Sequence, residues 1–290
     1  MMVKLVDIVV GGLLMGGIYA LIAVGFGLQY GVARVLNIAH GEFIMLGSFA
    51  AWTLFTMLGI SPLISLFISA PFFFIVGFAI YRVLYTPLRI SAESPAVFEG
   101  NSMLASFGLM FVIQNLALMI WGAPVRGYSY MAYPVNFLGT VFPANRIVTL
   151  LASVILGLAF YIFLASTRTG KAIRASAQDP DAAELMGVHI NRVLALCFGL
   201  GAMMAATGGL LLSMTSSTST PFMGMEYTLI AIIVVVLGGL GSIKGSFIGG
   251  FILGLVGYIV SSFEPGLSMV AYYAIFLFLL LVRPTGLFGK

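Results

Sequence analysis

The sequence has little charge. Only 8% of its 290 residues are charged, whereas 61% are hydrophobic, and the mean hydropathy is +1.14. Because so few polar side chains cannot cover a water-soluble globule, this composition excludes a soluble protein and predicts an integral membrane protein. The hydrophobic runs fill the chain, so we expect one transmembrane domain over residues 1–290 and no second, soluble domain.

The usual ligands of metal sites are also scarce. Cys197 is the only cysteine, and the two histidines are His40 and His189. A lone cysteine within an apolar run excludes an internal disulfide and a Cys-based metal site. Neither histidine has a neighbouring ligand at metal-binding spacing. We therefore expect no metal site.

Motifs of catalysis are missing as well. The phosphate-binding pattern G-x-x-x-x-G-K-[ST] fails at both of its nearest matches, since Gly170-Lys171 precedes Ala172 and Lys244 precedes Gly245. Neither H-E-x-x-H nor G-x-S-x-G occurs. We expect no catalytic residues, no cofactor bound by this chain and no ATP hydrolysis by it.

Long apolar runs are what the sequence does have. About 20 residues of helix cross a hydrocarbon core of about 30 Å. Segments such as "VILGLAFYIFLA" and "AYYAIFLFLLLV" are apolar on every side, whereas the strands of a β-barrel alternate. We predict an all-α, polytopic bundle with spans near residues 6–30, 35–58, 62–86, 101–121, 146–165, 192–214, 226–243, 245–263 and 266–282.

The number of spans is eight or nine. Only the glycine-rich "GGLGSIKGS" separates the predicted spans 226–243 and 245–263. Either of these two can therefore be a partial, re-entrant helix.

Basic residues predict the orientation, because lysine and arginine in short connections are retained on the cytoplasmic side. One side of the predicted bundle carries ten: Arg34, Arg82, Arg89, Arg168, Lys171, Arg174, Arg192, Lys244, Arg283 and Lys290. The other side carries Lys4, Arg126 and Arg146. The N-terminus is thus predicted outside and the C-terminus in the cytoplasm. The net charge of +4 reflects this orientation, and we expect no nucleic-acid partner.

Glycine and polar residues interrupt the spans in two stretches, residues 25–47 and 234–254. Their glycines either let helices approach closely or break a helix so that its end faces a polar solute. The candidates for these roles are Gly41, Gly238, Gly239, Gly241 and Gly245. Asn37, His40 and Glu42 are costly within hydrocarbon, so they face the bundle interior or lie at the cytoplasmic boundary.

The charged segment "GKAIRASAQDPDAAELMGVHINRV", residues 170–193, separates two apolar runs. Asp179 and Pro180 suit the first positions of a short helix, acidic Asp181 and Glu184 suit its N-terminal end, and Gly187 suits its stop. Such a helix either docks into a groove of another protein or rests on its own bundle. Its small and apolar contact residues are Ala182, Ala183, Leu185 and Met186.

Four motifs carry a family resemblance. "VLNIAHGEFIMLGS", the 170–193 segment, "VVVLGGLGSIKGSFIGGFILG" and "VRPTGLFGK" occur in order over nearly the whole chain. They resemble the permeases of branched-chain amino acid ABC importers, specifically the smaller, LivH-like subunit. Two features depart from that pattern: Ala-Ala-Glu stands in place of Glu-Ala-Ala, and Lys244 stands where many relatives have proline.

The resemblance implies a multi-pass subunit of a prokaryotic inner or plasma membrane, surrounded by lipid. Its implied partners are a second homologous permease in a hetero- or homodimer, two cytoplasmic ATPases that use ATP, and an extracytoplasmic solute-binding protein. A cytoplasmic coupling loop at about 167–191 would contact the ATPases through Asp179, Pro180, Asp181, Ala182, Ala183, Glu184, Leu185, Met186 and Gly187. ATP-driven movement of residues 178–190 would then tilt the spans 146–165 and 192–214.

The solute and its path stay open at this stage. We expect Asn37, His40, Gln114 and Asn115 to line the path of a branched-chain or related amino acid. Urea and short amides are alternatives, because related permeases carry them. An ion-coupled secondary transporter, with Glu42, Glu226 or Glu264 as the ion-binding acid, and an assembly subunit are rival functions.

Overall fold

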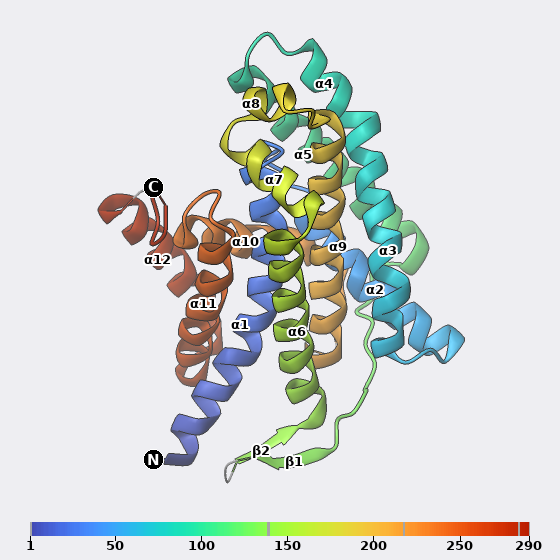
Figure 1. Ribbon diagram of the computed structural model, residues 1–290. Helices are drawn as coiled ribbons and strands as arrows, with labels where there is room; N and C mark the ends of the chain where they lie inside the picture. The colour runs from blue at the N-terminus through green and yellow to red at the C-terminus, as the bar shows by residue number, and fades with distance from the viewer. Residues whose placement is uncertain (1, 138–139, 217, 284, 290) are drawn as a thin grey trace.

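Helices make up almost all of the computed structural model, which describes residues 2–137, 140–216, 218–283 and 285–289 (Figure 1). The helices are α1 (Met2–Gly31), α2 (His40–Leu58), α3 (Pro62–Ile80), the π-helical turn η1 (Tyr81–Tyr85), α4 (Thr86–Ser91), α5 (Pro95–Trp121), α6 (Ala144–Ser166), α7 (Arg168–Gln178), α8 (Pro180–Leu185), α9 (Ile190–Ser216), α10 (Gly224–Gly238), α11 (Ile243–Phe263), the 3₁₀ turn η2 (Pro265–Leu267) and α12 (Ser268–Val282). One small antiparallel hairpin, β1 (Pro134–Phe137) with β2 (Thr140–Pro143), precedes α6.

Eight helical stretches of the described chain are long and apolar enough to cross a membrane. They are α1 from Val6 onwards, α2, the continuous α3–η1–α4 helix, α5, α6, α9, α11, and η2 with α12. The predicted helical membrane class is confirmed. The 15 residues of α10 are fewer than the roughly 20 that a full span needs, so α10 is the partial helix of the ambiguous pair.

Two helices are shorter than the predicted spans, because the chain is irregular inside the bundle. The span predicted at 35–58 begins only at His40, because residues 32–39 are not helical, and among them Arg34 adopts a left-handed φ of +54°. The span predicted at 226–243 ends at Gly238, since the next residue, Gly239, has a φ of +101°.

Two other spans are longer than predicted. The 62–86 span continues to Ser91, because the π-helical turn η1 carries the helix onward instead of ending it. The 101–121 span begins at Pro95, where the side chain of Ser94 accepts a hydrogen bond from the Val97 amide. A Ser-Pro pair of this kind is a typical helix start.

The helices α1 and α9 form the core. α9 packs against α1, α2 and α3, while α1 packs along α11. Gly250 and Gly254 of α11 lie against the backbone of Ala20 and Gly16 in α1, leaving no space for a Cβ atom. Lipid provides no hydrophobic force between helices, so close packing of small residues stabilises the pair.

The two ends of the bundle differ (Figure 1). α4, α7 and α8 lie at one end, called the α8 end below, and the N-terminus and the β1–β2 hairpin lie at the other, called the hairpin end. Near the C-terminus, the amides of Leu287 and Phe288 bond to the carbonyls of Leu237 and Gly238 at the end of α10. Lys290, part of the predicted charge asymmetry, lies outside the described residues.

Candidate functional site

Residues 32–39 carry the chain back into the bundle between α1 and α2. The Val35 amide donates to the Gln29 carbonyl at 3.2 Å, which closes the turn after α1. Val35, Asn37 and Ala39 are completely buried. α2 therefore begins inside the bundle instead of at its surface.

A buried polar cluster stands at this point. The His40 ring lies with Nε2 3.1 Å from the Ile22 carbonyl and Nδ1 3.1 Å from Gln29 Oε1. Asn37 Nδ2 also donates to Gln29 Oε1, at 3.0 Å, and Gln29 Nε2 donates to the Phe198 carbonyl at 3.2 Å. We call Gln29, Asn37 and His40 the His40 cluster. Because unpartnered buried polar groups are costly, the cluster ties α1, α2 and α9 together.

Glu42 lies where two helices start. It is only 1% exposed, and its Oε2 atom has no hydrogen-bond partner among the described residues. Its carboxyl lies against Gly224, the first residue of α10, at a place where a Cβ would overlap Oε1. The Gly41 amide donates to Thr228 Oγ1 at 2.8 Å and so joins α2 to α10. The partial positive charges of both helix N-termini therefore meet beside one carboxyl group.

Glycines shape the turn from α10 to α11. Gly239 and Gly241 have φ values of +101° and +83°, a region that residues with a Cβ rarely adopt. The backbones of Gly238 and Gly245 touch, so neither position has room for a side chain. Ser242 then caps α11 by accepting from the Gly245 amide at 3.1 Å.

Gln114 and Asn115 lie on α5, which packs against α2 and α4. Asn115 is exposed, and its Nδ2 donates to the Phe111 carbonyl of the same helix at 2.8 Å. Neither residue is part of the His40 cluster. Ser106 of α5 does reach the irregular residues 32–39, because its hydroxyl accepts from the Ile38 amide at 3.0 Å. Ser106 could not be predicted from the sequence, because a serine in an apolar helix carries no signal of its partner.

The segment predicted as a coupling loop consists of α7 and α8. Thr167 caps α7 by accepting from the Gly170 amide at 3.0 Å. Asp179 Oδ1 caps α8 by accepting from the amides of Asp181 and Ala182, both at 3.0 Å. Gly187, with a φ of +87°, follows its end.

α8 presents apolar side chains to the outside. Leu185 is 90% exposed and Met186 is 86% exposed, whereas Ala183 is buried against the bundle. The remaining residues of the segment are exposed: Asp179, Pro180, Asp181, Ala182, Glu184 and Gly187. Adjacent apolar side chains beside exposed charges are typical of a contact site for another protein.

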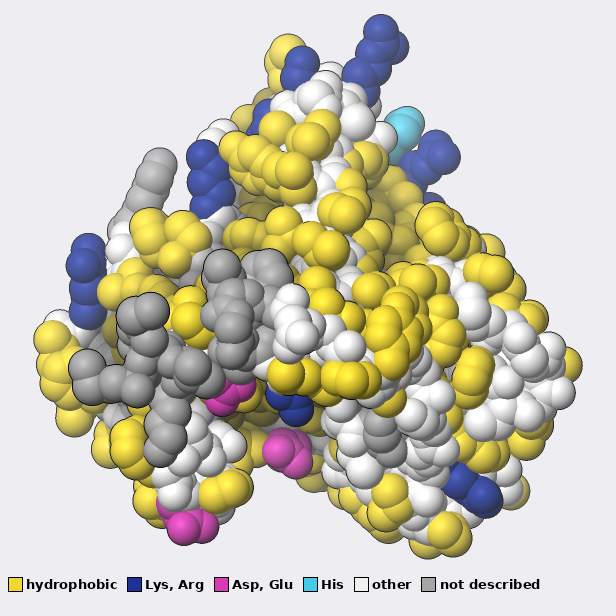
Figure 2. Space-filling model, turned by 90° about the horizontal axis from the view of Figure 1, so that it is seen from below, with side chains coloured by type: hydrophobic (Ala, Val, Ile, Leu, Met, Phe, Trp, Pro, Cys, Tyr) yellow, Lys and Arg dark blue, Asp and Glu magenta, His cyan; other side chains and the backbone are white. Residues whose placement is uncertain are grey.

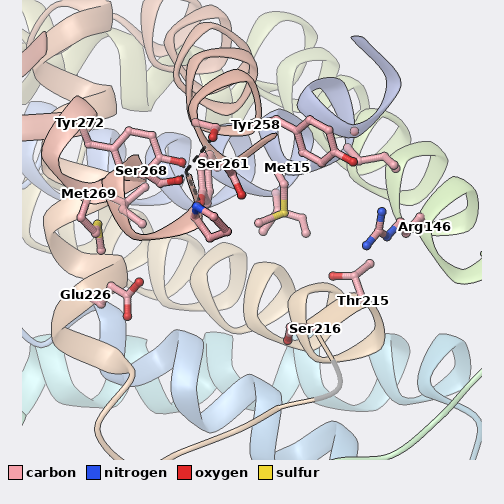
Figure 3. A pocket seen from close by; sticks show the side chains of 17 residues that line it. Met15, Arg146, Thr215, Ser216, Glu226, Tyr258, Ser261, Ser268, Met269 and Tyr272 are labelled. Carbon is pink, nitrogen blue, oxygen red and sulfur yellow. Dashed lines mark hydrogen bonds between the residues drawn. The ribbon is translucent and has the colours of Figure 1, made fainter. Parts of the chain in front are cut away.

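A pocket of about 340 Å³ lies toward the hairpin end, between α1, α6, α9, α10, α11 and α12 (Figure 3). Leu14, Met15 and Ile18 give it apolar walls. One base, Arg146, and one acid, Glu226, stand toward opposite sides of it, so its formal charge is zero. Seen from the hairpin end, the surface is hollowed near its centre, with basic and acidic side chains beside the hollow (Figure 2).

Tyrosine and serine hydroxyls give the pocket its polar character. The hydroxyls of Tyr19 and Tyr272 lie 3.4 Å apart, with their rings edge to face. Ser261 and Ser268 add further hydroxyls to the lining. Their proximity could not be predicted from the sequence, because they come from helices that are far apart in the chain.

These features define a polytopic helical membrane protein, with helices interrupted inside the bundle and a short, exposed helix, α8, at one end. Within the described residues, no group of three or more His, Cys, Asp or Glu could hold a metal ion.

Comparison with known proteins gives the family. The family described as "Branched-chain amino acid transport system / permease component" matches residues 8–282, and the chain belongs to it. The high-affinity branched-chain amino acid transport system permease protein LivH of Escherichia coli K12 is 31% identical over 295 residues, which cover 96% of this chain and 94% of LivH. The corresponding protein BraD of Pseudomonas aeruginosa is 31% identical, with 97% and 94% covered.

A solved structure shares the fold. "PsaBC from Streptococcus pneumoniae in complex with Fab" matches with a TM-score of 0.50 and 15% identity, covering 95% of this chain and 91% of that one. The chain is therefore an ABC importer permease, a multi-pass transport subunit without an ATPase domain, homologous to bacterial inner-membrane permeases. Membership in this family implies ATPase and binding-protein partners.

Proposed function

We propose that this permease carries branched-chain or related apolar amino acids inward. The pocket of Figure 3 supports this solute class, because a formally neutral lining with apolar walls and several hydroxyls suits a neutral, zwitterionic solute. The names of LivH and BraD support the same solute. Urea and short amides fit less well, since they have no apolar side chain to fill such walls.

The proposed orientation has the N-terminus outside and the C-terminus in the cytoplasm. The hairpin end then faces the solute-binding protein, and the α8 end faces a pair of ATPases. A second permease, a homologue or another copy of this chain, completes the complex. The exposed Leu185 and Met186 support α8 as the ATPase contact.

Coupling is mechanical in this proposal. α7 packs against α6, whose Leu164 carbonyl accepts from Arg174, and α8 packs against α9. Force on residues 178–190 would therefore tilt α6 and α9. Alternating access of the path follows from this tilt.

The proposed path passes the interrupted helices. Asn37 and His40 are its candidates from α1–α2, and Gln114 and Asn115 are its candidates from α5. Ends of discontinuous helices in a bundle supply backbone groups for charged parts of a solute. The start of α10 beside Glu42 is such an end.

Uptake into proteoliposomes tests the function. The complex of this chain, its second permease and its ATPases is reconstituted, and the binding protein is added with radiolabelled leucine. We expect uptake only with ATP and both ATPases, with competition by valine and isoleucine but not by urea or acetamide. Equal competition by urea would contradict the solute, and ion-driven uptake by this chain alone would support a secondary transporter. Normal uptake without this chain would mean that the chain is an assembly subunit and does not form the solute path.

A further inference from the structure

A second cavity, of about 510 Å³, lies at the α8 end between α1, α6, α7 and α11. Its walls include the apolar side chains of Val32, Leu164 and Ile173. Two cations, Arg174 and Lys244, line it, and no acidic side chain is among the described residues that do so. The cavity is thus apolar within and positively charged, unlike the neutral pocket at the hairpin end.

Both cations are held in place. Lys244 Nζ lies 5.6 Å from the centre of the Tyr161 ring, a cation–π contact. Arg174 donates from Nη1 to the Leu164 carbonyl in the last turns of α6. The two side chains come from α7 and α11, so an anion between them would join these helices.

The cavity lies at the ends of membrane-length helices, where we place the boundary between membrane and water. Tyr161 and Leu164 are near the end of α6, and Lys244 is the second residue of α11. Further into the membrane, Leu158 of α6 and Ile248 of α11 are 54% and 41% exposed. A cationic site with apolar surface below it matches an anionic amphiphile, whose head stays at the boundary while its chains remain in the hydrocarbon.

We propose that this cavity binds the phosphate of an anionic phospholipid. Arg174 and Lys244 pair with the phosphodiester, and the acyl chains run over the exposed apolar side chains of α6 and α11. The lipid thereby connects α7, the first helix of the charged segment, with the glycine-rich start of α11. Free phosphate shares the charge but gains nothing from the apolar walls, so the lipid is the occupant.

Native mass spectrometry of the full-length chain tests this site. The chain is released from micelles that contain either phosphatidylglycerol or phosphatidylcholine, and the apparent Kd of the first bound lipid is measured. We expect tighter binding of phosphatidylglycerol. Loss of one cation should weaken it about fivefold and loss of both about 25-fold, since each basic residue near a membrane surface contributes about 1 kcal/mol.

The variants are Lys244→Gln, Arg174→Gln and their combination. Lys244→Arg and Arg174→Lys keep the charge and should restore binding even if the neutral variants loosen the fold. Arg82→Gln is the matched control, because Arg82 also stands over an aromatic ring, Phe78 at 5.4 Å, but does not line the cavity. It should leave the Kd unchanged.

Competition separates the lipid from free phosphate. Inorganic phosphate and glycerol phosphate at millimolar concentration should not displace phosphatidylglycerol. Displacement by either would overturn the lipid assignment. Equal binding of both lipids, or an equal loss in Arg82→Gln and Lys244→Gln, would overturn the site itself. None of these readouts depends on which solute is transported.

Discussion

Gly47 and Gly209 bring α2 and α9 into backbone contact. A Cβ at Gly47 would overlap the Ala206 carbonyl, and one at Gly209 would overlap the Ile44 carbonyl. Because these obstacles are backbone atoms, no side-chain rotation can make room. We predict that Gly47→Ala lowers the free energy of unfolding by about 1–3 kcal/mol, measured by denaturant titration of the purified chain in micelles.

Gly108→Ala is the control for this packing. Nothing lies within 4 Å of a Cβ at Gly108, on α5. Alanine also favours a helix over glycine, so stability should stay unchanged or rise by up to about 1 kcal/mol. A similar loss in both variants would mean that the loss at Gly47 does not come from the α2–α9 contact.

His40 holds the buried cluster together, and its removal leaves Gln29 Oε1 and the Ile22 carbonyl each short of a contact. We predict that His40→Ala costs about 2–4 kcal/mol of stability, chiefly from the cavity that it leaves in the bundle. The same unfolding titration measures it. His189→Ala, at the exposed second histidine, should cost nearly nothing. Equal stability of the two variants would contradict a structural role for the cluster.

Among the elements, α8 is the proposed ATPase contact. Docking of its exposed apolar and acidic side chains on an ATPase should be lost when they are changed. We predict that Glu184→Arg and Leu185→Ser each reduce ATPase co-purification at least tenfold while membrane insertion stays normal. For Leu185→Ser the size follows from the burial of one leucine at the contact, which contributes about 1.5–3 kcal/mol.

A charge reversal elsewhere controls for this effect. Glu264 is exposed after α11 and does not belong to α7 or α8. Glu264→Arg should leave ATPase co-purification intact. Unchanged co-purification of Glu184→Arg would count against α8 as the docking helix.

The elements also show what sequence can and cannot predict. Apolar runs and the caps of α8 are local properties, so helices, their class and the Asp179–Pro180 start could be predicted from the chain alone. The re-entrant residues 32–39 could not, since "VARVLNIA" is apolar enough to continue a span. What fixes them is tertiary: the Gln29 side chain on α1 and the Ser106 hydroxyl on α5.

At the scale of the whole molecule, the same limit applies to the sites. Arg146 and Glu226 meet one pocket although they lie on α6 and α10, and no spacing in the chain connects them. The charge asymmetry is different, because it counts the lysines and arginines between the spans and does not depend on which helices are in contact. It predicts which end of the bundle faces the cytoplasm before any helix is placed.

That orientation can be tested on intact cells. In a Cys197→Ala background, which removes the one buried thiol, Glu184→Cys reports the α8 end and Glu264→Cys reports the end of α11 on the opposite side. A membrane-impermeant maleimide should label Glu264→Cys in intact cells and Glu184→Cys only after permeabilisation, as read by mass shift. Labelling of Glu184→Cys in intact cells would mean that the α8 end faces the outside, opposite to the proposed orientation. An ATPase in the cytoplasm could then not reach α8, and the proposed coupling would fail with the orientation.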